Sequence, residues 1–441
     1  MHTDSKAREL IKYVAPAILE MVSIFLFTIV DGIFVGQGIG TDALGAVNLA
    51  FPFVMGFTAL TMMTTAGGLT VFSIRLGRGD LEGTRVTFSY SLFLTTLVSA
   101  LFSFIGIFFY RQVSTLMGAN STFLDMTGEY LFWYSVFLIP CGLGIAVQGF
   151  VRNDGNPLLV SISTIIATML NVFADWLFIF PLKMGLKGAA IATGISQTVC
   201  LLINCIHFFN KKCTLRLKYG KIDFRLIKTI LLRGTPECVS EFSAPVSVAL
   251  TNTMLIKYLG DTAVNAFSLI CYVASFAAAV FTGTAEGIQP LLGYCYGAKE
   301  EEDLKYYYRK GVLISVVGAA LISVIVIFAW SWICGMFGVD DNTFEVSRHA
   351  VIRYEWGFVL EAVTVIISAY LYSTTKTGHA LTINVLRSFV VNSLVILLLP
   401  AVFGADSIWV TFGIYEGIVL VIAVILKRCA DRKGIIREVQ E

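Results

Sequence analysis

The chain has 441 residues, of which 56 % are hydrophobic and 14 % are charged. Soluble globular proteins carry about a quarter charged residues, so this composition excludes a soluble protein. The formal net charge of +2 says little by itself, and the positions of the charged residues carry more information than their sum.

Long apolar runs follow one another along the whole chain. Each has about 20 residues or more, which is enough to cross a lipid bilayer as a helix. The twelve candidate spans are approximately 13–37, 44–74, 86–110, 123–150, 157–180, 188–209, 228–256, 262–292, 310–334, 346–374, 378–402 and 407–426. The first run is too long for a cleaved signal peptide, whose apolar stretch has about 7–15 residues. The sequence therefore predicts an all-α integral membrane protein with twelve transmembrane helices.

The lysines and arginines gather in every second connection between these spans. The connections on one side, together with both termini, hold 24 of them, and the connections on the other side hold 4. Positively charged loops stay in the cytoplasm, so we expect a multi-pass protein of a bacterial cytoplasmic membrane with both termini inside. The basic stretch 211–228 is interpreted as a cytoplasmic loop near anionic lipid, and we expect no nucleic-acid partner.

The two halves of the sequence repeat each other at an offset of 219 or 220 residues. Matching positions include Pro16 and Pro236, Gly40 and Gly260, Gly77 and Gly297, and Pro181 and Pro400. Six spans per copy is an even number, so the copies insert in the same orientation, related by a pseudo-two-fold axis along the membrane normal. We predict an N-terminal six-helix bundle at 1–210, a cytoplasmic linker at 211–227 and a C-terminal six-helix bundle at 228–441.

Carboxylates lie inside several spans, where an ionisable side chain costs about 2.5–3.5 kcal/mol on insertion scales and marks a functional site by default. In the first span, Asp31 of "FTIVDGIFVGQGIG" follows Glu20 by three helical turns on nearly the same face. In the fifth span, Asn171 and Asp175 of "MLNVFADWLFIF" are four residues apart, so an amide and a carboxylate share one helix face.

The second half places its acids at other positions of the repeat. Its candidates are Glu237 and Glu241 in the seventh span, Glu286 of "GTAEGIQP" and Glu361 in the tenth span. A carboxyl group shielded from water can take up a proton at cellular pH, and an ionised one can hold an organic cation. Competition between a proton and a cation for the same acid is the simplest form of antiport.

These acids also have structural alternatives. Asp31 could cap a helix break, and Glu286 could satisfy backbone N–H groups freed at a helix irregularity. Glu20, Glu237 and Glu361 could be accommodated by snorkelling or by a local partner. Arg353 and Glu355 are interpreted as a structural or gating pair near the outer end of the tenth span.

No motif indicates a metal site, a cofactor or a catalytic centre. The nine cysteines form no C-x-x-C pair, and none of the four histidines has a partner at metal-ligand spacing. The glycines at 36, 38 and 40 are neither preceded by a strand nor followed by Lys-Ser/Thr, as a phosphate-binding loop requires. We therefore expect no enzyme activity and no cofactor.

Four stretches of the sequence resemble a transporter family, the multidrug and toxic compound extrusion (MATE) transporters, and within it the bacterial MepA-type branch. They are "VDGIFVGQGIGTDALGAVNLAFP", "QGFVRNDGNPLL", "NVFADWLFIFPLKMGLKGAAIATGISQ" and "GIQPLLGYCYGAK". The likeness covers essentially the whole chain. It implies a V-shaped arrangement of two six-helix bundles and the export of cationic drugs in exchange for protons or sodium.

The resemblance also implies roles for particular residues. Asp31 and Asp175 match the family's paired acids of helices one and five, and Asn171 matches their partner amide; a sodium ion, if it is the coupling ion, would bind there. Glu286 matches an acid of helix eight found in this branch, and Glu241 lies in the helix that bears an acid in another branch. The helix-ten aspartate of that other branch has no clear match, although Glu361 is nearby.

We therefore predict that the protein is a secondary active exporter of lipophilic organic cations that works by alternating access, with H⁺ or Na⁺ as coupling ion. We expect Glu286, Glu241, Glu361, Glu237 and Glu20 to bind substrate or ions, and we expect a monomer within the lipid bilayer. Two alternatives remain open, a lipid-linked oligosaccharide or polysaccharide flippase and a polytopic membrane enzyme. The anionic cargo of a flippase calls for several buried cations, and the arginines within helices are Arg233, Arg348, Arg353 and Arg387, mostly near helix ends.

Overall fold

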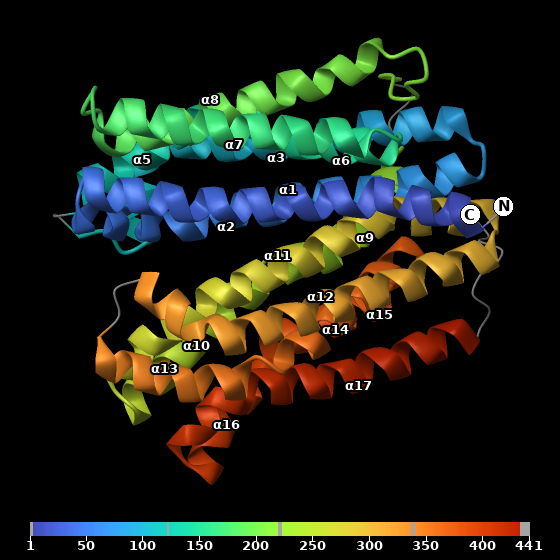
Figure 1. Cartoon of the computed structure of the whole chain (residues 1–441). Coiled ribbons are helices and arrows are strands. Elements are labelled where there is room, and N and C mark those ends of the chain that lie inside the picture. The colour runs from blue at the N-terminus through green and yellow to red at the C-terminus, as the bar shows by residue number, and fades with distance from the viewer. Residues whose placement is uncertain (1–2, 121–122, 219–222, 337–339, 433–441) are drawn as a thin grey trace. The chain divides into compact units, whose positions relative to one another are not determined.

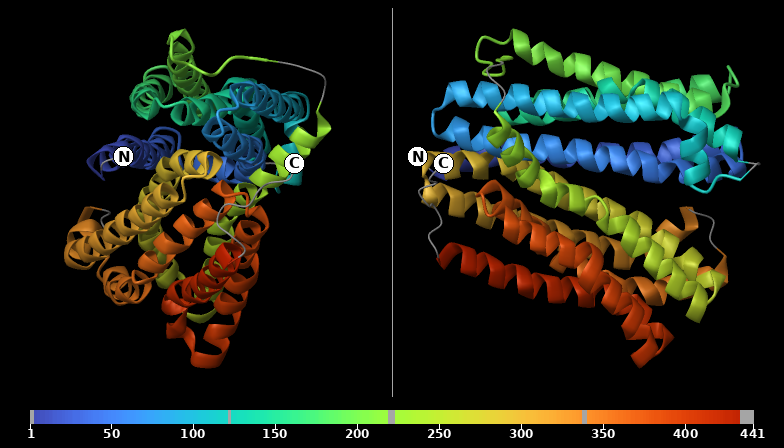
Figure 2. Two further views of the ribbon diagram at one scale, coloured as in Figure 1. Left: turned by 90° about the vertical axis from the view of Figure 1, so that its right-hand side faces the viewer. Right: turned by 180° about the vertical axis from the view of Figure 1, so that it is seen from behind.

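The computed structural model describes the whole chain except residues 1–2, 121–122, 219–222, 337–339 and 433–441. Part of the predicted linker and the end of the last basic segment lie outside the described residues. The described residues form helices and connections and contain no strand. They fall into two compact units, Met1–Cys238 and Val239–Glu441, and within each unit the long helices run side by side (Figure 1, Figure 2).

The described residues of the first unit form eight α-helices, one 3-10 helix and most of a ninth α-helix. They are α1 (Thr3–Gly38), α2 (Thr41–Gly77), α3 (Leu81–Phe108), α4 (Tyr110–Leu116), α5 (Leu124–Val136), α6 (Leu138–Asn153), α7 (Pro157–Ile179), α8 (Gly185–Cys205), η1 (Ile206–Phe209) and α9 (Phe224–Ser240). Helix α7 packs on both α1 and α8, and α2 packs on α3. The contact between α1 and α7 brings the first and fifth predicted spans together.

The second unit contains the remaining helices. They are α10 (Ser243–Tyr258), α11 (Asp261–Ala298), α12 (Glu301–Met336), α13 (Asp341–Tyr354), α14 (Gly357–Ser373), α15 (Thr377–Val385), the π-helical segment η2 (Leu386–Val390), α16 (Val391–Phe403), the 3-10 helix η3 (Ala405–Val410) and α17 (Thr411–Arg432). Its apolar core includes Phe267, Phe358 and a stacked pair, Tyr354 and Phe412, whose ring centroids are 4.4 Å apart.

These helices account for the twelve predicted spans. Nine helices of the described residues are long and apolar enough to cross a membrane, and two bent pairs, α5 with α6 and α13 with α14, raise the number to eleven. The remaining predicted span, 228–256, is divided between α9 and α10. The prediction of an all-helical membrane protein is confirmed.

Two interruptions have an identifiable cause in the sequence. A proline within a helix removes the hydrogen bond to the carbonyl four residues earlier and its ring clashes there. Pro245 stands four residues after Glu241, where α9 and α10 are separated, and Pro140 stands four residues after Val136, where α5 ends. The position that matches Pro245 in the first half is Phe25, and α1 continues through it without a break.

The bend between α5 and α6 is 53°, and the bend between α13 and α14 is 45°. The two bends lie at matching positions of the repeat, near Phe137 in the first half and near Trp356 in the second. The second half has no proline there, and the bend instead coincides with Gly357, whose missing side chain leaves room for Phe412. Both copies thus keep the bend with different residues.

The division between the units falls beyond the predicted linker 211–227 because the first turns of α9 pack on α2 and α3. Leu226 and Ile230 of α9 join a cluster with Val71 and Tyr90. The backbones approach closely at Gly234, where a Cβ atom would lie 1.7 Å from the carbonyl oxygen of Met63. Small residues allow such close helix crossings in membrane proteins.

Candidate functional site

The packing of α1 on α7 places Asp31 beside Asp175. Their carboxyl groups share a hydrogen bond, although 144 residues separate them in sequence. Asn171, one turn before Asp175 on α7, donates its side-chain amide to Asp175 Oδ2 at 2.8 Å and accepts from the backbone N–H of Thr193 at 3.1 Å, in the orientation that satisfies both groups. Asp175 and Asn171 are buried, with exposed fractions of 0 % and 1 %.

Two carboxyl groups can form a hydrogen bond only if one of them carries a proton, because two carboxylates offer acceptors alone. Like charges in contact also repel strongly when water is excluded. Among the described residues, no backbone or neighbouring donor group reaches the buried Oδ1 atoms of the two aspartates. Tyr130 of α5 lies near both acids. The pair therefore has the chemistry of a site that binds and releases a proton, and carboxylate oxygens are also ligands that sodium accepts.

A second charged group lies within the second unit, where one arginine contacts two glutamates. Arg387 of η2 donates from Nη2 to Glu361 of α14 at 2.5 Å and from Nε to Glu416 of α17 at 2.7 Å. Glu416 is completely buried, and the side chains of Arg387 and Glu361 are 12 % exposed. We call these three residues the Arg387 cluster.

The Arg387 cluster holds two acids and one base, so its charge is −1 unless one acid is protonated. The Oε2 atom of Glu416 is buried and has no hydrogen-bond partner among the residues that the structure describes. Buried polar atoms are nearly always paired, so such an atom calls for an explanation. Arg387 also lies in a π-helical turn, a rare conformation that is frequent at functional sites. The cluster can therefore accept one further proton or cation.

The other predicted acids have different surroundings. Glu20 forms an ion pair with Arg152 of α6, with 2.7 Å between Oε2 and Nη2, and both side chains are buried. Glu241, at the break between α9 and α10, lies near Glu286 of α11, so their charges interact. Glu237 is half-buried in α9, one turn before Glu241.

The structure thus brings together Asp31, Asp175 and Asn171, and it also brings Glu241 near Glu286. Two residues of the Arg387 cluster were absent from the predicted set. Glu416 is a lone carboxylate inside the last apolar run, so the rule that singled out Asp31 would have found it. Arg387 was expected near a helix end together with the other intrahelical arginines, but it lies between α15 and α16 and contacts two acids.

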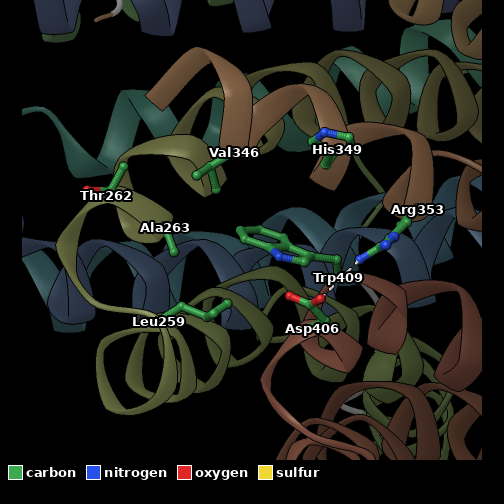
Figure 3. A pocket seen from close by; sticks show the side chains of 8 residues that line it. All are labelled: Leu259, Thr262, Ala263, Val346, His349, Arg353, Asp406 and Trp409. Atoms are coloured by element: carbon green, nitrogen blue, oxygen red, sulfur yellow. Dashed lines mark ion pairs between the residues drawn. The ribbon is translucent and has the colours of Figure 1, made fainter. Parts of the chain in front are cut away.

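A pocket of about 280 Å³ lies at another place in the second unit (Figure 3). It is lined by Leu259, Thr262, Ala263, Val346, His349, Arg353, Asp406 and Trp409. Arg353 faces Asp406 of η3, at 3.8 Å between Nη1 and Oδ2. Both side chains of this pair are largely exposed, so the pair contributes little to stability. The interpretation of Arg353 and Glu355 as a structural or gating pair stays a prediction.

Comparison with known proteins matches the chain to one transporter family in both halves. The MatE family model matches residues 16–177 and again residues 236–398, which reproduces the offset of the internal repeat. Among curated proteins, the chain is 24 % identical over 406 residues to the multidrug export protein MepA of Staphylococcus saprophyticus, a match that covers 91 % of this chain and 89 % of that protein. It is also 24 % identical over 376 residues to YoeA of Bacillus subtilis, described as a probable multidrug resistance protein, covering 82 % of this chain and 80 % of YoeA.

Solved structures show the same fold. A variant of the Vibrio cholerae MATE transporter VcmN superposes with a TM-score of 0.91 at 20 % identity, covering 98 % of this chain and 99 % of that chain. A transporter of the MOP superfamily from Pyrococcus furiosus superposes with a TM-score of 0.90 at 20 % identity, covering 97 % of each chain. The described helices therefore have the architecture of these transporters.

Proposed function

Because the chain belongs to the MatE family of transporters, we propose that this multi-pass membrane protein exports lipophilic organic cations in exchange for protons or sodium by alternating access. The observation that carries the proposal is the hydrogen-bonded pair of Asp31 and Asp175, supported by Asn171. We place the protein in a bacterial cytoplasmic membrane, with both termini inside, working as a monomer without a cofactor.

In this mechanism Asp31 and Asp175 load a coupling ion when the site opens to the outside and release it when the site opens to the inside. Asn171 fixes the orientation of Asp175, so that the carboxyl keeps one geometry while its charge changes. The organic cation binds in the opposite phase, with Glu241 and Glu286 supplying negative charge and with aromatic side chains contacting its apolar part. The mutual repulsion of Glu241 and Glu286 favours a cation between or beside them.

The Arg387 cluster provides a second ion site in this proposal. A cluster of charge −1 in a low-dielectric interior gains most from one additional positive charge, and a proton on Glu416 provides it. The unpaired Oε2 of Glu416 supports this assignment. The proposal also accounts for the different acid positions of the two halves, because each half then binds its own ion.

The surroundings of the buried arginines favour the exporter over the flippase alternative. Arg152 and Arg387, which are buried in the first and second unit, each contact at least one carboxylate. Their charge is thereby compensated, whereas recognition of an anionic cargo needs positive charge that faces the cargo. Buried acids also outnumber these arginines, which suits a cationic substrate.

The test is the accumulation of a fluorescent cation such as ethidium in inverted membrane vesicles. Vesicles that contain the protein should accumulate the dye when a proton or a sodium gradient is imposed, and running the two gradients separately identifies the coupling ion. The Asp31→Asn, Asp175→Asn double variant, at equal expression, should accumulate no more dye than empty vesicles. Gradient-driven accumulation by the double variant equal to that of the unaltered protein would refute the assignment of the pair.

A further inference from the structure

Three side chains with metal-ligating atoms converge in the first unit, and none of them belongs to the acids described above. Asp154 follows the end of α6, His207 lies in η1, and Cys213 lies in the connection that leads on toward α9. One donor atom from each lies within 4.8 Å of the other two. All three are buried, with exposed fractions of 2 % and 3 % for the Asp154 and His207 side chains and 7 % for Cys213. Sequence spacing gave no sign of this site because 53 residues separate Asp154 from His207.

The donor set suits one class of ion. An imidazole nitrogen, a carboxylate oxygen and a cysteine sulfur are the ligand types that zinc accepts, at bond lengths of about 2.0–2.3 Å. Around a tetrahedral zinc ion such donors are about 3.3–3.7 Å apart, as follows from those bond lengths. His207 Nε2 and Asp154 Oδ2 are 2.8 Å apart and are joined by a hydrogen bond. A metal ion would take the place of the hydrogen-bonded proton after small rotations of the two side chains.

Neighbouring groups hold two of the three ligands, Asp154 and His207, in place. Thr214 donates to Asp154 twice, from its backbone N–H to Oδ2 at 3.0 Å and from its hydroxyl group to Oδ1. Asn156 contacts His207 Nδ1 at 3.3 Å. Partners of this kind orient metal ligands and fix the histidine tautomer. The thiol of Cys213 contacts the carbonyl of Leu215 at 3.6 Å and interacts with the Asp154 side chain.

We propose that Asp154, His207 and Cys213 bind one zinc ion, with water in the fourth position. On binding, Cys213 releases its thiol proton to solvent, and the proton of His207 resides on Nδ1, where the amide oxygen of Asn156 accepts it once the amide turns over. The zinc ion fastens the start of the connection from η1 to α9 onto the end of α6 and onto η1. This site is independent of the transport cycle proposed above.

The experiment uses the purified full-length protein in detergent, stripped of metal with a chelator and titrated with Co²⁺, a spectroscopic substitute for zinc. We expect one Co²⁺ per chain, an absorption band from thiolate-to-cobalt charge transfer, and loss of that band when Zn²⁺ displaces Co²⁺. The Cys213→Ser variant should lose the charge-transfer band and bind zinc at least tenfold more weakly. The matched control is Cys205→Ser, which alters a half-buried cysteine nearby and should keep both the band and the affinity.

A second variant tests the proposal even if the Cys213→Ser variant does not fold. Asn156→Ala leaves all three ligands in place and should weaken zinc binding by about tenfold, the lower end of the usual effect of such supporting groups, while the charge-transfer band remains. Helical content, measured by circular dichroism, confirms that each variant is folded. Absence of Co²⁺ and Zn²⁺ binding at micromolar concentrations in the unaltered protein would show that the cluster is a hydrogen-bonded anchor only and would overturn the proposal. An unchanged band in Cys213→Ser would also overturn it.

Discussion

Replacing Arg387 by glutamine removes the positive charge that lies between Glu361 and Glu416. Two unit charges 4 Å apart attract by about 4 kcal/mol at an effective dielectric constant of about 20, and Arg387 has two such partners, at 2.5 and 2.7 Å. The carboxyl groups can take up protons after the substitution, which limits the loss. Removal of one partner from a buried ion pair typically costs about 3–5 kcal/mol, and we expect the free energy of unfolding to fall by this amount.

The Glu416→Gln substitution should have a much smaller effect at the same place. It keeps the side-chain volume and leaves Arg387 in a one-to-one pair with Glu361, so the cluster becomes neutral. We expect the free energy of unfolding to change by about 1 kcal/mol or less. The Arg387→Gln, Glu416→Gln double variant should recover part of the loss caused by Arg387→Gln, because fewer uncompensated acids remain.

The measurement is denaturant-induced unfolding of the full-length protein in one detergent at one pH, followed by circular dichroism for all three variants. The control is Arg111→Gln, which breaks an exposed pair with Asp125 at 3.4 Å and should change the free energy of unfolding by about 0.5 kcal/mol or less. If Arg387→Gln is as mild as this control, or if Glu416→Gln is equally damaging, the charge count of the cluster is wrong.

Three further predictions concern the acid pair, a helix crossing and the driving force. Asp31→Asn alone should abolish gradient-driven ethidium export while the protein still reaches the membrane at normal level, and retained export in vesicles would count against a shared ion site with Asp175. Gly234→Ala places a methyl group 1.7 Å from the carbonyl oxygen of Met63 and should lower the melting temperature of the protein in detergent. The control is Gly417→Ala, whose methyl group would lie 3.6 Å from its nearest neighbour and which should leave the melting temperature unchanged. Equal melting temperatures of the two variants would contradict the close crossing. With ion sites in both units, more than one ion can enter for each monovalent cation exported, so export should respond to the membrane potential. Each net charge moved across the membrane gains about 2.3 kcal/mol per 100 mV. Voltage-independent transport in proteoliposomes whose potential is clamped with potassium and valinomycin would indicate one-for-one exchange.

The sequence was sufficient to predict the number of spans and the repeat, because both depend on sums over many residues. Hydropathy averaged over about 20 residues identifies a span but does not register a single proline, so the break at Glu241 and the bend near Phe137 were not predicted. The prolines that explain them, Pro245 and Pro140, are visible in the sequence. The steric rule for helix interiors does not single them out by itself, because Pro16, Pro52 and Pro290 lie inside continuous helices.

The candidate sites were predictable only in part, because contacts between distant residues depend on packing. Asp31 and Asp175 were each identified as acids inside an apolar run, and their direct contact follows from the packing of α1 on α7. No local pattern pairs Arg387 with Glu416, or Asp154 with His207. In both cases the partners lie on different helices or connections, and the fold decides which side chains meet.

The matched bends separate what the two copies share from what each copy has alone. A feature that occupies the same place in both copies, near Phe137 and near Trp356, belongs to the six-span unit itself. The separation of α9 from α10 at Glu241 has no counterpart in α1, and so it belongs to the second copy alone. An isolated six-span copy of either half should therefore keep its bend, whereas the break at Glu241 is a property by which the two halves can act differently.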